Sequence, residues 1–171
     1  MRYIFENVNS NKDQQKKTSN SNYTLWMNAI LRRAKEIGKV ELPICSIILD
    51  ERGRCIGRGV NKRNINKDPL GHAEIMALRQ ASLIKNDWRF NECIIITNLE
   101  PCTMCASVLI QARMGKVVFG AYDKKRGGLG GSIDLSKHKS SHHKMEIVGG
   151  ILEDECSKNL QLWFKKLRTQ K

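Results

Sequence analysis

The residues best suited to chemistry are His72 and Glu74, separated by one alanine, and the Pro-Cys-Thr-Met-Cys run at 101–105, which begins 27 residues after Glu74. The imidazole of His72 and the thiolates of Cys102 and Cys105 are three candidate zinc ligands. Three protein ligands leave a fourth tetrahedral position for water, as in catalytic rather than structural zinc sites. Glu74 need not share the metal and is free to move protons. The spacing therefore predicts a catalytic zinc centre with one acid–base carboxylate.

The same spacing gives the metal site a structural rationale. Pro101 suits the first position of a helix, where its missing N–H costs nothing. Cys102 and Cys105 then lie on one face of the first helical turn, and the helix N-terminus favours the thiolate form that binds metal. His72 is also expected to begin a helix, so two helix N-termini can meet at one point.

A Cys-x-x-Cys pair also occurs in redox-active dithiols and in zinc ribbons. A ribbon needs a second closely spaced pair, which the remaining cysteines do not supply: they are Cys45, Cys55, Cys93 and Cys156. A redox motif would leave His72 and Glu74 unexplained. The two halves together resemble the His-x-Glu…Pro-Cys-x-x-Cys signature of zinc-dependent base deaminases.

The length of 171 residues is typical of one domain with a sizeable core. Residues 1–22 are polar, and we expect them to form an N-terminal extension to a deaminase domain at 23–171. This extension has no apolar run like that of a secretory signal, and no stretch approaches the roughly 20 apolar residues of a membrane span. Because the cysteines outside the metal motif are scattered, we expect free thiols and a cytoplasmic location.

Basic residues outnumber acidic ones, 30 against 17, which gives a net charge of +13. The segment 52–67 carries six basic residues, 116–144 carries seven, and the chain from Lys158 onward carries five and no acid. Such a field favours a polyanionic partner, and a small-molecule deaminase has no obvious need for it. Together with the metal motif, the charge predicts a nucleic-acid substrate.

Hydrophobic periodicity and turn residues predict an α/β fold. The expected helices are 23–37, 72–84, 101–114 and 152–167, and the expected strands are 44–49, 55–60, 93–97, 116–121 and 145–148. Strand–helix alternation after the first hairpin favours a three-layer α/β/α sandwich with a central mixed five-stranded sheet. The Gly-rich run 127–131 lacks the spacing of a phosphate loop, and we interpret it as flexible backbone in a long loop.

The resemblance extends beyond the metal motif. Segments 59–61, 72–79, 99–106, 117–121 and 150–156 are similar to those of the bacterial tRNA-specific adenosine deaminases, and the similarity spans about 23–168. It implies the cytidine deaminase fold, a homodimer with one Zn²⁺ per subunit, and conversion of the wobble adenosine of an arginine tRNA to inosine. The anticodon stem-loop would be the bound part of the tRNA.

In this hypothesis zinc lowers the pKa of bound water toward about 7, and Glu74 moves the protons. By resemblance, Asn61 hydrogen-bonds the purine, and backbone N–H groups at the start of the Cys102 helix hold the developing charge. The resemblance also assigns anticodon-loop contacts to an aromatic and basic C-terminal helix. The residues concerned are Trp163, Phe164, Lys165 and Lys166, and we expect at least one of the two aromatic rings to pack on the core.

Two positions depart from the family pattern: Leu70-Gly71 stands where Thr-Ala is common, and Asn98 where Thr is usual. Both are expected to flank the pocket, where they would change fine substrate contacts and leave the metal site intact. A guanine or cytosine deaminase acting on a free base or nucleoside is the main alternative, but it would not explain the basic tail. A catalytically idle tRNA-binding module is a second alternative, and an intact Glu74 argues against it.

Overall fold

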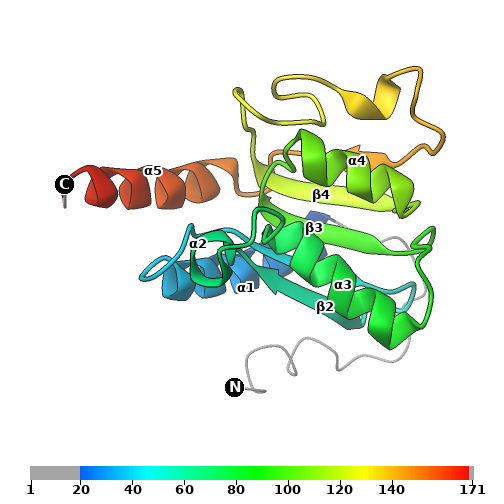
Figure 1. Ribbon diagram of the computed structural model, residues 1–171, viewed down its shortest axis with the longest axis horizontal. Helices are drawn as coiled ribbons and strands as arrows, with labels where there is room; N and C mark the ends of the chain where they lie inside the picture. Colours follow the sequence, from blue (N-terminus) through cyan, green and yellow to red (C-terminus); the bar gives the residue numbers. More distant parts are fainter. Residues whose placement is uncertain (1–19, 170–171) are drawn as a thin grey trace.

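The computed structural model describes residues 20–169, and its centre is a five-stranded sheet with strand order β2-β1-β3-β4-β5 (Figure 1). The strands are β1 (Cys45–Leu49), β2 (Cys55–Val60), β3 (Ile94–Leu99), β4 (Lys116–Ala121) and β5 (Glu146–Val148). The helices are α1 (Asn20–Ile37), α2 (Arg63–Asn66), α3 (Ala73–Lys85), α4 (Thr103–Gln111) and α5 (Glu153–Thr169), with a 3-10 helix η2 (Leu135–Lys137).

The sheet is mixed. β1 is antiparallel to both β2 and β3, whereas β3, β4 and β5 run parallel to one another. Parallel neighbours need a crossover, and α4 supplies it between β3 and β4. As a result, α4 begins at the edge of the sheet where β3 ends.

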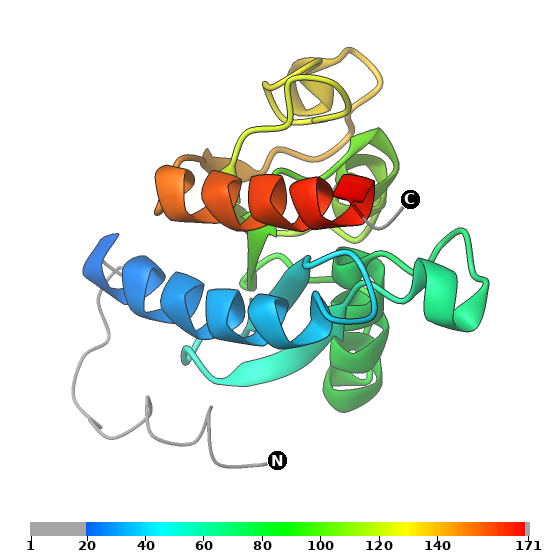
Figure 2. The same cartoon turned by 90° about the vertical axis from the view of Figure 1, so that its left-hand side faces the viewer.

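Both faces of the sheet are covered. Ile95 of β3 packs in one apolar cluster with residues of α3 and α4, whereas its neighbours Ile94 and Ile96 pack in a second cluster with residues of α1 and α5. Figure 2 shows α1 and α5 side by side on their face of the sheet. Burial on both faces explains why this strand is apolar without alternation. The predicted three-layer α/β/α sandwich with a mixed five-stranded sheet is confirmed.

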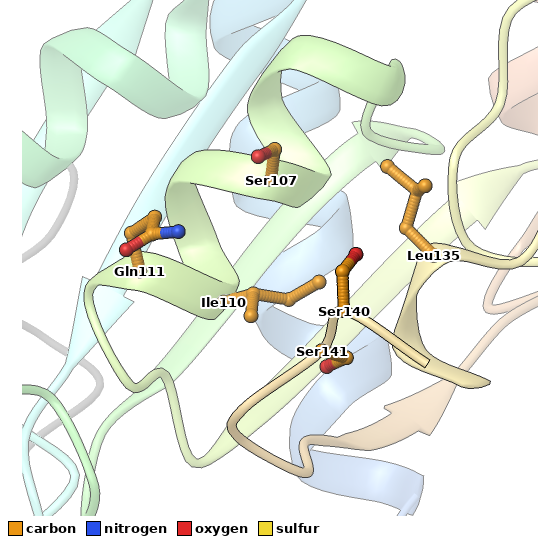
Figure 3. Close-up of a pocket in the computed structure, with 6 residues that line it drawn as sticks. All are labelled: Ser107, Ile110, Gln111, Leu135, Ser140 and Ser141. Atoms are coloured by element: carbon orange, nitrogen blue, oxygen red, sulfur yellow. The ribbon is translucent and has the colours of Figure 1, made fainter. Parts of the chain in front are cut away.

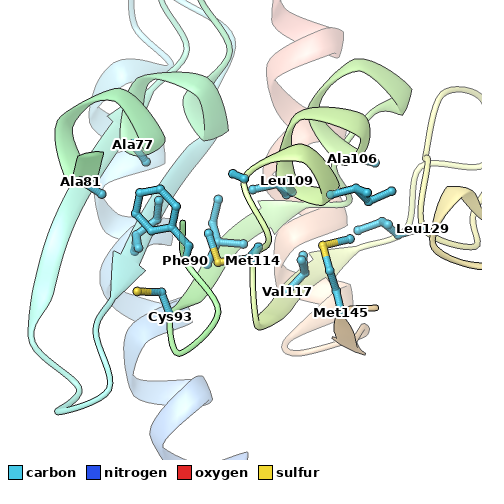
Figure 4. Packing of buried hydrophobic residues seen from close by; sticks show 14 of the residues in the cluster. Ala77, Ala81, Phe90, Cys93, Ala106, Leu109, Met114, Val117, Leu129 and Met145 are labelled. Atoms are coloured by element: carbon cyan, nitrogen blue, oxygen red, sulfur yellow. The ribbon is translucent and has the colours of Figure 1, made fainter. Parts of the chain in front are cut away.

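Small residues bring α3 close to the sheet. Figure 4 shows Ala77 and Ala81 of α3 beside the fully buried ring of Phe90 in the first cluster. In β2, a side chain at Gly59 would overlap the backbone of Ala73, so only glycine allows this approach. The close contact places the start of α3 beside the end of β2.

Several element boundaries differ from those predicted. The first helix begins at Asn20, three residues before the expected start, and the rest of the expected N-terminal extension lies outside the described residues. The short helix α2 was not predicted. The fourth helix ends at Gln111 rather than at residue 114, because Arg113 adopts a left-handed backbone conformation, with φ of 53°.

Helix α5 extends past the end of the sheet toward the C-terminus (Figure 1). From residue 161 to 169 its side chains are exposed except for the half-buried Trp163. Within residues 20–169, none of the helices is long and apolar enough to cross a membrane.

Candidate metal centre

Two helix starts bring the predicted metal ligands together. His72 and Cys102 are the N-cap residues of α3 and α4. The Nδ1 atom of His72 lies 3.6 Å from Sγ of Cys102 and 3.5 Å from Sγ of Cys105. Pro101 precedes the helix instead of starting it, but both sulfurs still face the histidine.

The geometry fits zinc. The three ligand atoms lie within 4.8 Å of one another. In a tetrahedral site with Zn–S near 2.3 Å and Zn–N near 2.05 Å, nitrogen and sulfur are about 3.6 Å apart, which is the separation found for both His72–cysteine pairs. One imidazole and two thiolates suit zinc, and three protein ligands is the number typical of catalytic sites.

Glu74 lies in the first turn of α3, and only 5% of its surface is exposed. Its carboxyl group hydrogen-bonds the side chain of Cys105 but is not part of the ligand cluster. Burial raises the pKa of Glu74 to about 7. A carboxyl group with such a pKa, beside but outside the ligand set, can both accept and donate a proton near neutral pH.

The two metal-motif thiols differ in acidity. The pKa of Cys102 is lowered to about 4 because Cys105 hydrogen-bonds its sulfur and His72 lies beside it. The pKa of Cys105 is raised by the same hydrogen bond and by burial, and the hydrogen bond to Cys102 also raises the pKa of His72. Zinc binding must therefore release protons from this cluster.

The other cysteines have no such environment. Burial raises the pKa of Cys45 and Cys156 to about 12 and that of Cys93 to about 11, and all six cysteines of the chain are free. These three thiols are core residues, as predicted.

Asn61 follows β2 directly and is buried. Its backbone N–H donates to the carbonyl of Ile44 at 3.0 Å, and its side-chain Nδ2 donates to Oε1 of Glu41 at 3.0 Å. The next residue, Lys62, donates its backbone N–H to the carbonyl of Gly71 at 2.7 Å. The loop that starts after Asn61 therefore closes immediately before His72, and both residues lie at the same edge of the sheet.

The Gly-rich run 127–131 folds around a buried carboxylate, so our interpretation of it as flexible backbone was wrong. Glu100 accepts hydrogen bonds from the backbone N–H groups of Asp123, Leu129 and Gly131, each at 2.9 Å. Side chains at Gly127 or Gly131 would overlap the Glu100 carboxylate. The glycines are required because the backbone wraps closely around this group.

The same loop lies against the start of α4. The backbone N–H of Thr103 donates to the carbonyl of Arg126 at 3.2 Å, and the N–H of Cys105 hydrogen-bonds the sulfur of Cys102. The backbone N–H groups of Thr103 and Cys105 are among those expected to hold developing charge, and both are thus hydrogen-bonded within the protein. The loop also carries three exposed cations, Lys124, Lys125 and Arg126. They directly precede Gly127, which forms an isolated β-bridge with Cys102.

The predicted RNA-contacting residues lie on the outer half of α5. Trp163 packs against the end of α1, where its Nε1 donates to the carbonyl of Gly38 at 2.9 Å. Its ring meets that of Phe164 edge to face, with centroids 5.0 Å apart. Phe164, Lys165 and Lys166 are exposed. Trp163 is therefore half-buried against the segment that follows α1 without belonging to either apolar cluster, and RNA contact by the four residues stays a prediction.

The side-chain amide of Asn98 is hydrogen-bonded to backbone groups of the protein. It is fully buried, its Oδ1 accepts from the backbone N–H of Cys45 at 2.8 Å, and its Nδ2 donates to the carbonyl of Pro43 at 2.9 Å. The asparagine that departs from the family pattern therefore makes its hydrogen bonds with the backbone at the start of β1. Leu70 is exposed and Gly71 is buried.

Two buried acids were missed in the sequence. Glu41 organises the loop after Asn61, and Glu100 organises the Gly-rich loop. The available signal was an acid set among apolar residues: Leu42, Pro43 and Ile44 follow Glu41, and Leu99 precedes Glu100. Acids are rarely buried without partners, so such positions indicate local hydrogen-bonding centres.

A small surface pocket lies between α4 and the loop around η2 (Figure 3). Its lining is made of Ser107, Ile110, Gln111, Leu135, Ser140 and Ser141. None of these is an ionisable side chain or belongs to the metal cluster. Hydroxyl and amide groups alone offer no acid–base pair, so the candidate site remains the metal centre.

Comparisons with known proteins agree with this site. Residues 20–121 match the family model of the cytidine and deoxycytidylate deaminase zinc-binding region. The chain is 34% identical over 139 residues to a tRNA-specific adenosine deaminase of Haemophilus influenzae, covering 81% of this chain and 79% of the relative. It is also 34% identical over 148 residues to the tRNA-specific adenosine deaminase of Bacillus subtilis, covering 86% and 91%.

Solved structures show the same fold. A structure from studies of A-to-I editing by tRNA deaminases at the wobble position of transfer RNA superposes with a TM-score of 0.76 and 30% identity, covering 80% of this chain and 99% of that one. A guanine deaminase from Nitrosomonas europaea has a TM-score of 0.68 at 20% identity, covering 82% and 83%. The second likeness shows the fold alone.

Proposed function

The chain belongs to the zinc-binding cytidine and deoxycytidylate deaminase family and, within it, to the tRNA-specific adenosine deaminases, and we propose that it deaminates the wobble adenosine of a tRNA to inosine. An arginine tRNA is the proposed substrate, recognised through its anticodon stem-loop. The observation that carries the deamination chemistry is a buried carboxyl group, Glu74, in contact with Cys105 but outside the ligand cluster.

His72, Cys102 and Cys105 would hold one Zn²⁺ per subunit, and bound zinc would make hydroxide available near neutral pH. Glu74 would take one proton of the attacking water and deliver it to the ring nitrogen beside carbon 6 of adenine. It would then take the proton of the hydroxyl group formed on carbon 6 and pass it to the amino group, which leaves as ammonia. Burial of Glu74, which raises the pKa of its carboxyl group in the metal-free protein, makes the protonated form accessible and so suits it to proton transfer. Asn61, at the start of the loop that precedes His72, would hold the purine by hydrogen bonds.

RNA as the substrate is supported by charge. The net charge of +13 favours a polyanion. Lys165 and Lys166 on α5 would contact phosphates, with Phe164 and Trp163 nearby for base stacking or for packing on the core. The exposed cations at 124–126, carried by the loop on the start of α4, would meet phosphates closer to the metal centre.

Two further parts of the proposal follow from the family. We propose that the active form is a homodimer and that the protein works in the cytoplasm. Six free cysteines, two of them metal ligands, fit a reducing compartment.

The test uses purified zinc-loaded protein and a synthetic arginine-tRNA anticodon stem-loop with adenosine at the wobble position. We expect inosine to form in this substrate, and free adenosine, guanine and cytosine to react poorly. The matched control is a stem-loop with the adenosine moved one position along the loop. Efficient deamination of free guanine without reaction of the stem-loop would favour the free-base alternative.

A further inference from the structure

We propose that Glu41 is a positioning residue that holds the side chain of Asn61, and the loop before His72, in the geometry needed to bind the base. This inference rests on the proposed function, because Asn61 is assigned there to the purine. Glu41 itself is not assigned a contact with the substrate or the metal. It would act through Asn61.

Glu41 is a hydrogen-bonding centre at the edge of the sheet, with 1% of its surface exposed. Its Oε1 accepts from the Leu42 N–H at 3.0 Å, from Asn61 Nδ2 at 3.0 Å and from Asn64 Nδ2 at 3.1 Å. Its Oε2 accepts from the N–H groups of Asn64 at 2.8 Å and Ile65 at 3.1 Å. All five donors are amide groups, and four of them come from the segment that begins at Asn61.

This arrangement needs a charged carboxylate. Burial acts to raise the pKa of Glu41, but the hydrogen bonds from Leu42, Ile65, Asn64 and Asn61 together lower it below its ordinary value. Hydrogen bonds to an ionised acceptor are shorter and stronger than those between neutral groups. A glutamine amide has one oxygen and one N–H₂ group, so it could not accept from all five donors.

Hydrogen bonds on both sides of Glu41 connect it to the sheet and to the loop before the metal histidine. On one side, Asn98 fixes the backbone at Pro43 and Cys45, so the chain just after Glu41 is anchored to β3. On the other side, the loop held by Glu41 closes through Lys62 and Gly71 immediately before His72. Glu41 thus joins the sheet edge to the loop between Asn61 and the metal histidine.

The hydrogen bond also orients the Asn61 amide. Its Nδ2 carries two hydrogens, and Glu41 binds one of them. With one amide hydrogen fixed on a buried carboxylate, rotation of the side chain would break a charge-assisted hydrogen bond. The remaining N–H and the carbonyl oxygen of Asn61 are therefore kept in one orientation, in which they would meet the base.

The test is a double-mutant cycle on the zinc-loaded protein, using Glu41→Gln, Asn61→Ala and the double variant. The matched control is Asp50→Asn, because Asp50 is also a buried carboxylate, with hydrogen bonds from Arg52 N at 3.0 Å and Arg54 N at 2.9 Å, but at the opposite end of β1. Inosine formation in the stem-loop, zinc content and the thermal midpoint are measured for each.

We expect Glu41→Gln to lower kcat/KM by about tenfold to a hundredfold, the cost of a misplaced binding group, with the same split between kcat and KM as Asn61→Ala. In the Asn61→Ala background, Glu41→Gln should lower kcat/KM by less than about a further threefold. Zinc content should be unchanged, and Asp50→Asn should lower the midpoint without lowering kcat/KM. Losses that multiply, loss of zinc in Glu41→Gln, or an equal activity loss in Asp50→Asn would each overturn the proposal.

A second measurement does not depend on how Glu41→Gln folds or on the substrate. The side-chain amide signal of Asn61 is assigned in ¹⁵N-labelled wild-type protein by its absence from Asn61→Ala. We expect one of its protons to exchange slowly with solvent, because it is buried on a carboxylate. Rapid exchange of both protons would overturn the proposal. If the wild type forms no inosine while this proton is protected, the proposed function fails and the contact stands.

Discussion

The change Glu74→Gln replaces the buried carboxyl group with an amide of nearly the same shape. The amide can hydrogen-bond Cys105 but cannot accept or release a proton near neutral pH. Because Glu74 is outside the ligand cluster, zinc content should remain that of the wild type. General acid–base groups contribute about 100- to 10,000-fold, and Glu74 is assigned several transfers, so we expect kcat to fall by about 10,000-fold or more.

The same substitution should not weaken the fold. Burial raises the pKa of Glu74 from 4.5 to about 7, and at about 1.36 kcal/mol per pKa unit the ionised form carries a cost on the order of 3 kcal/mol. Below pH 4.5 the group is protonated in both folded and unfolded chains. Between pH 4.5 and about 7 the unfolded chain ionises first, so the wild type loses stability as pH rises. Glutamine has no such loss.

The assay combines single-turnover inosine formation in the stem-loop, zinc analysis, and the free energy of unfolding of metal-free protein, where no bound cation offsets the buried charge. At pH 8 the metal-free variant should be at least as stable as the wild type, and at pH 4 the difference should have shrunk. Retention of more than about a tenth of the wild-type rate would remove Glu74 from the mechanism. Lower stability of the variant at pH 8 would show that burial does not destabilise the ionised form of Glu74.

Three further perturbations test the metal ligands, the basic tail and Glu41. Cys102→Ser and Cys105→Ser should each lose bound zinc and nearly all activity, since a hard oxygen replaces a soft thiolate; metal analysis and inosine formation check this. Deleting residues 165–171 should weaken tRNA binding and reduce the slope of log K against log salt by roughly 0.7 to 0.9 per lost phosphate contact, as measured by titration at several salt concentrations. In Glu41→Gln, the deficit in the free energy of unfolding relative to the wild type should be complete above pH 4.5 and shrink as pH falls below it, because the folded-state pKa of Glu41 is lowered from 4.5; denaturant titrations across pH measure it.

Each of these outcomes has a control. Cys93→Ser, at a buried thiol outside the cluster, should keep its zinc, so a zinc loss as large as that of the motif variants would contradict the ligand assignment. Arg52→Gln removes one charge at the hairpin turn beside Asp50 and should leave the salt slope nearly unchanged. A tail deletion with an unaltered slope would place the phosphate contacts elsewhere. If the deficit in the free energy of unfolding of Glu41→Gln did not change with pH, the carboxylate of Glu41 would not be ionised in the wild type.

The sequence predicted the metal ligands because each half of the motif lies at a helix start, and because the two halves together match the His-x-Glu…Pro-Cys-x-x-Cys signature, although His72 lies 30 residues from Cys102. Cys102 and Cys105 are three residues apart at a helix start, and His72 caps a second helix at the same sheet edge. The apolar run Ile94–Ile96 also predicted a strand covered on both faces. Secondary-structure spacing decides where the side chains of the two cysteines and of the strand lie, whereas the contact with His72 is tertiary.

Features that depend on tertiary contacts were not predictable in this way. Glu41 meets Asn61 across 20 residues of sequence, and no periodic pattern links them. The helix end at Gln111 was missed because Met114 continues the apolar pattern; it is fully buried, but in the turn after the helix, where its N–H donates to the carbonyl of Leu109 at 3.0 Å. The order of the Gly-rich loop comes from Glu100, a group outside the loop itself.

The most direct test of the central claim is to incubate the zinc-loaded protein with total bacterial tRNA and to map inosine by sequencing. The account predicts inosine at the first anticodon position of an arginine tRNA, dependent on Glu74 and on zinc. Absence of inosine from that position, in zinc-loaded protein that deaminates a free base or nucleoside instead, would contradict it.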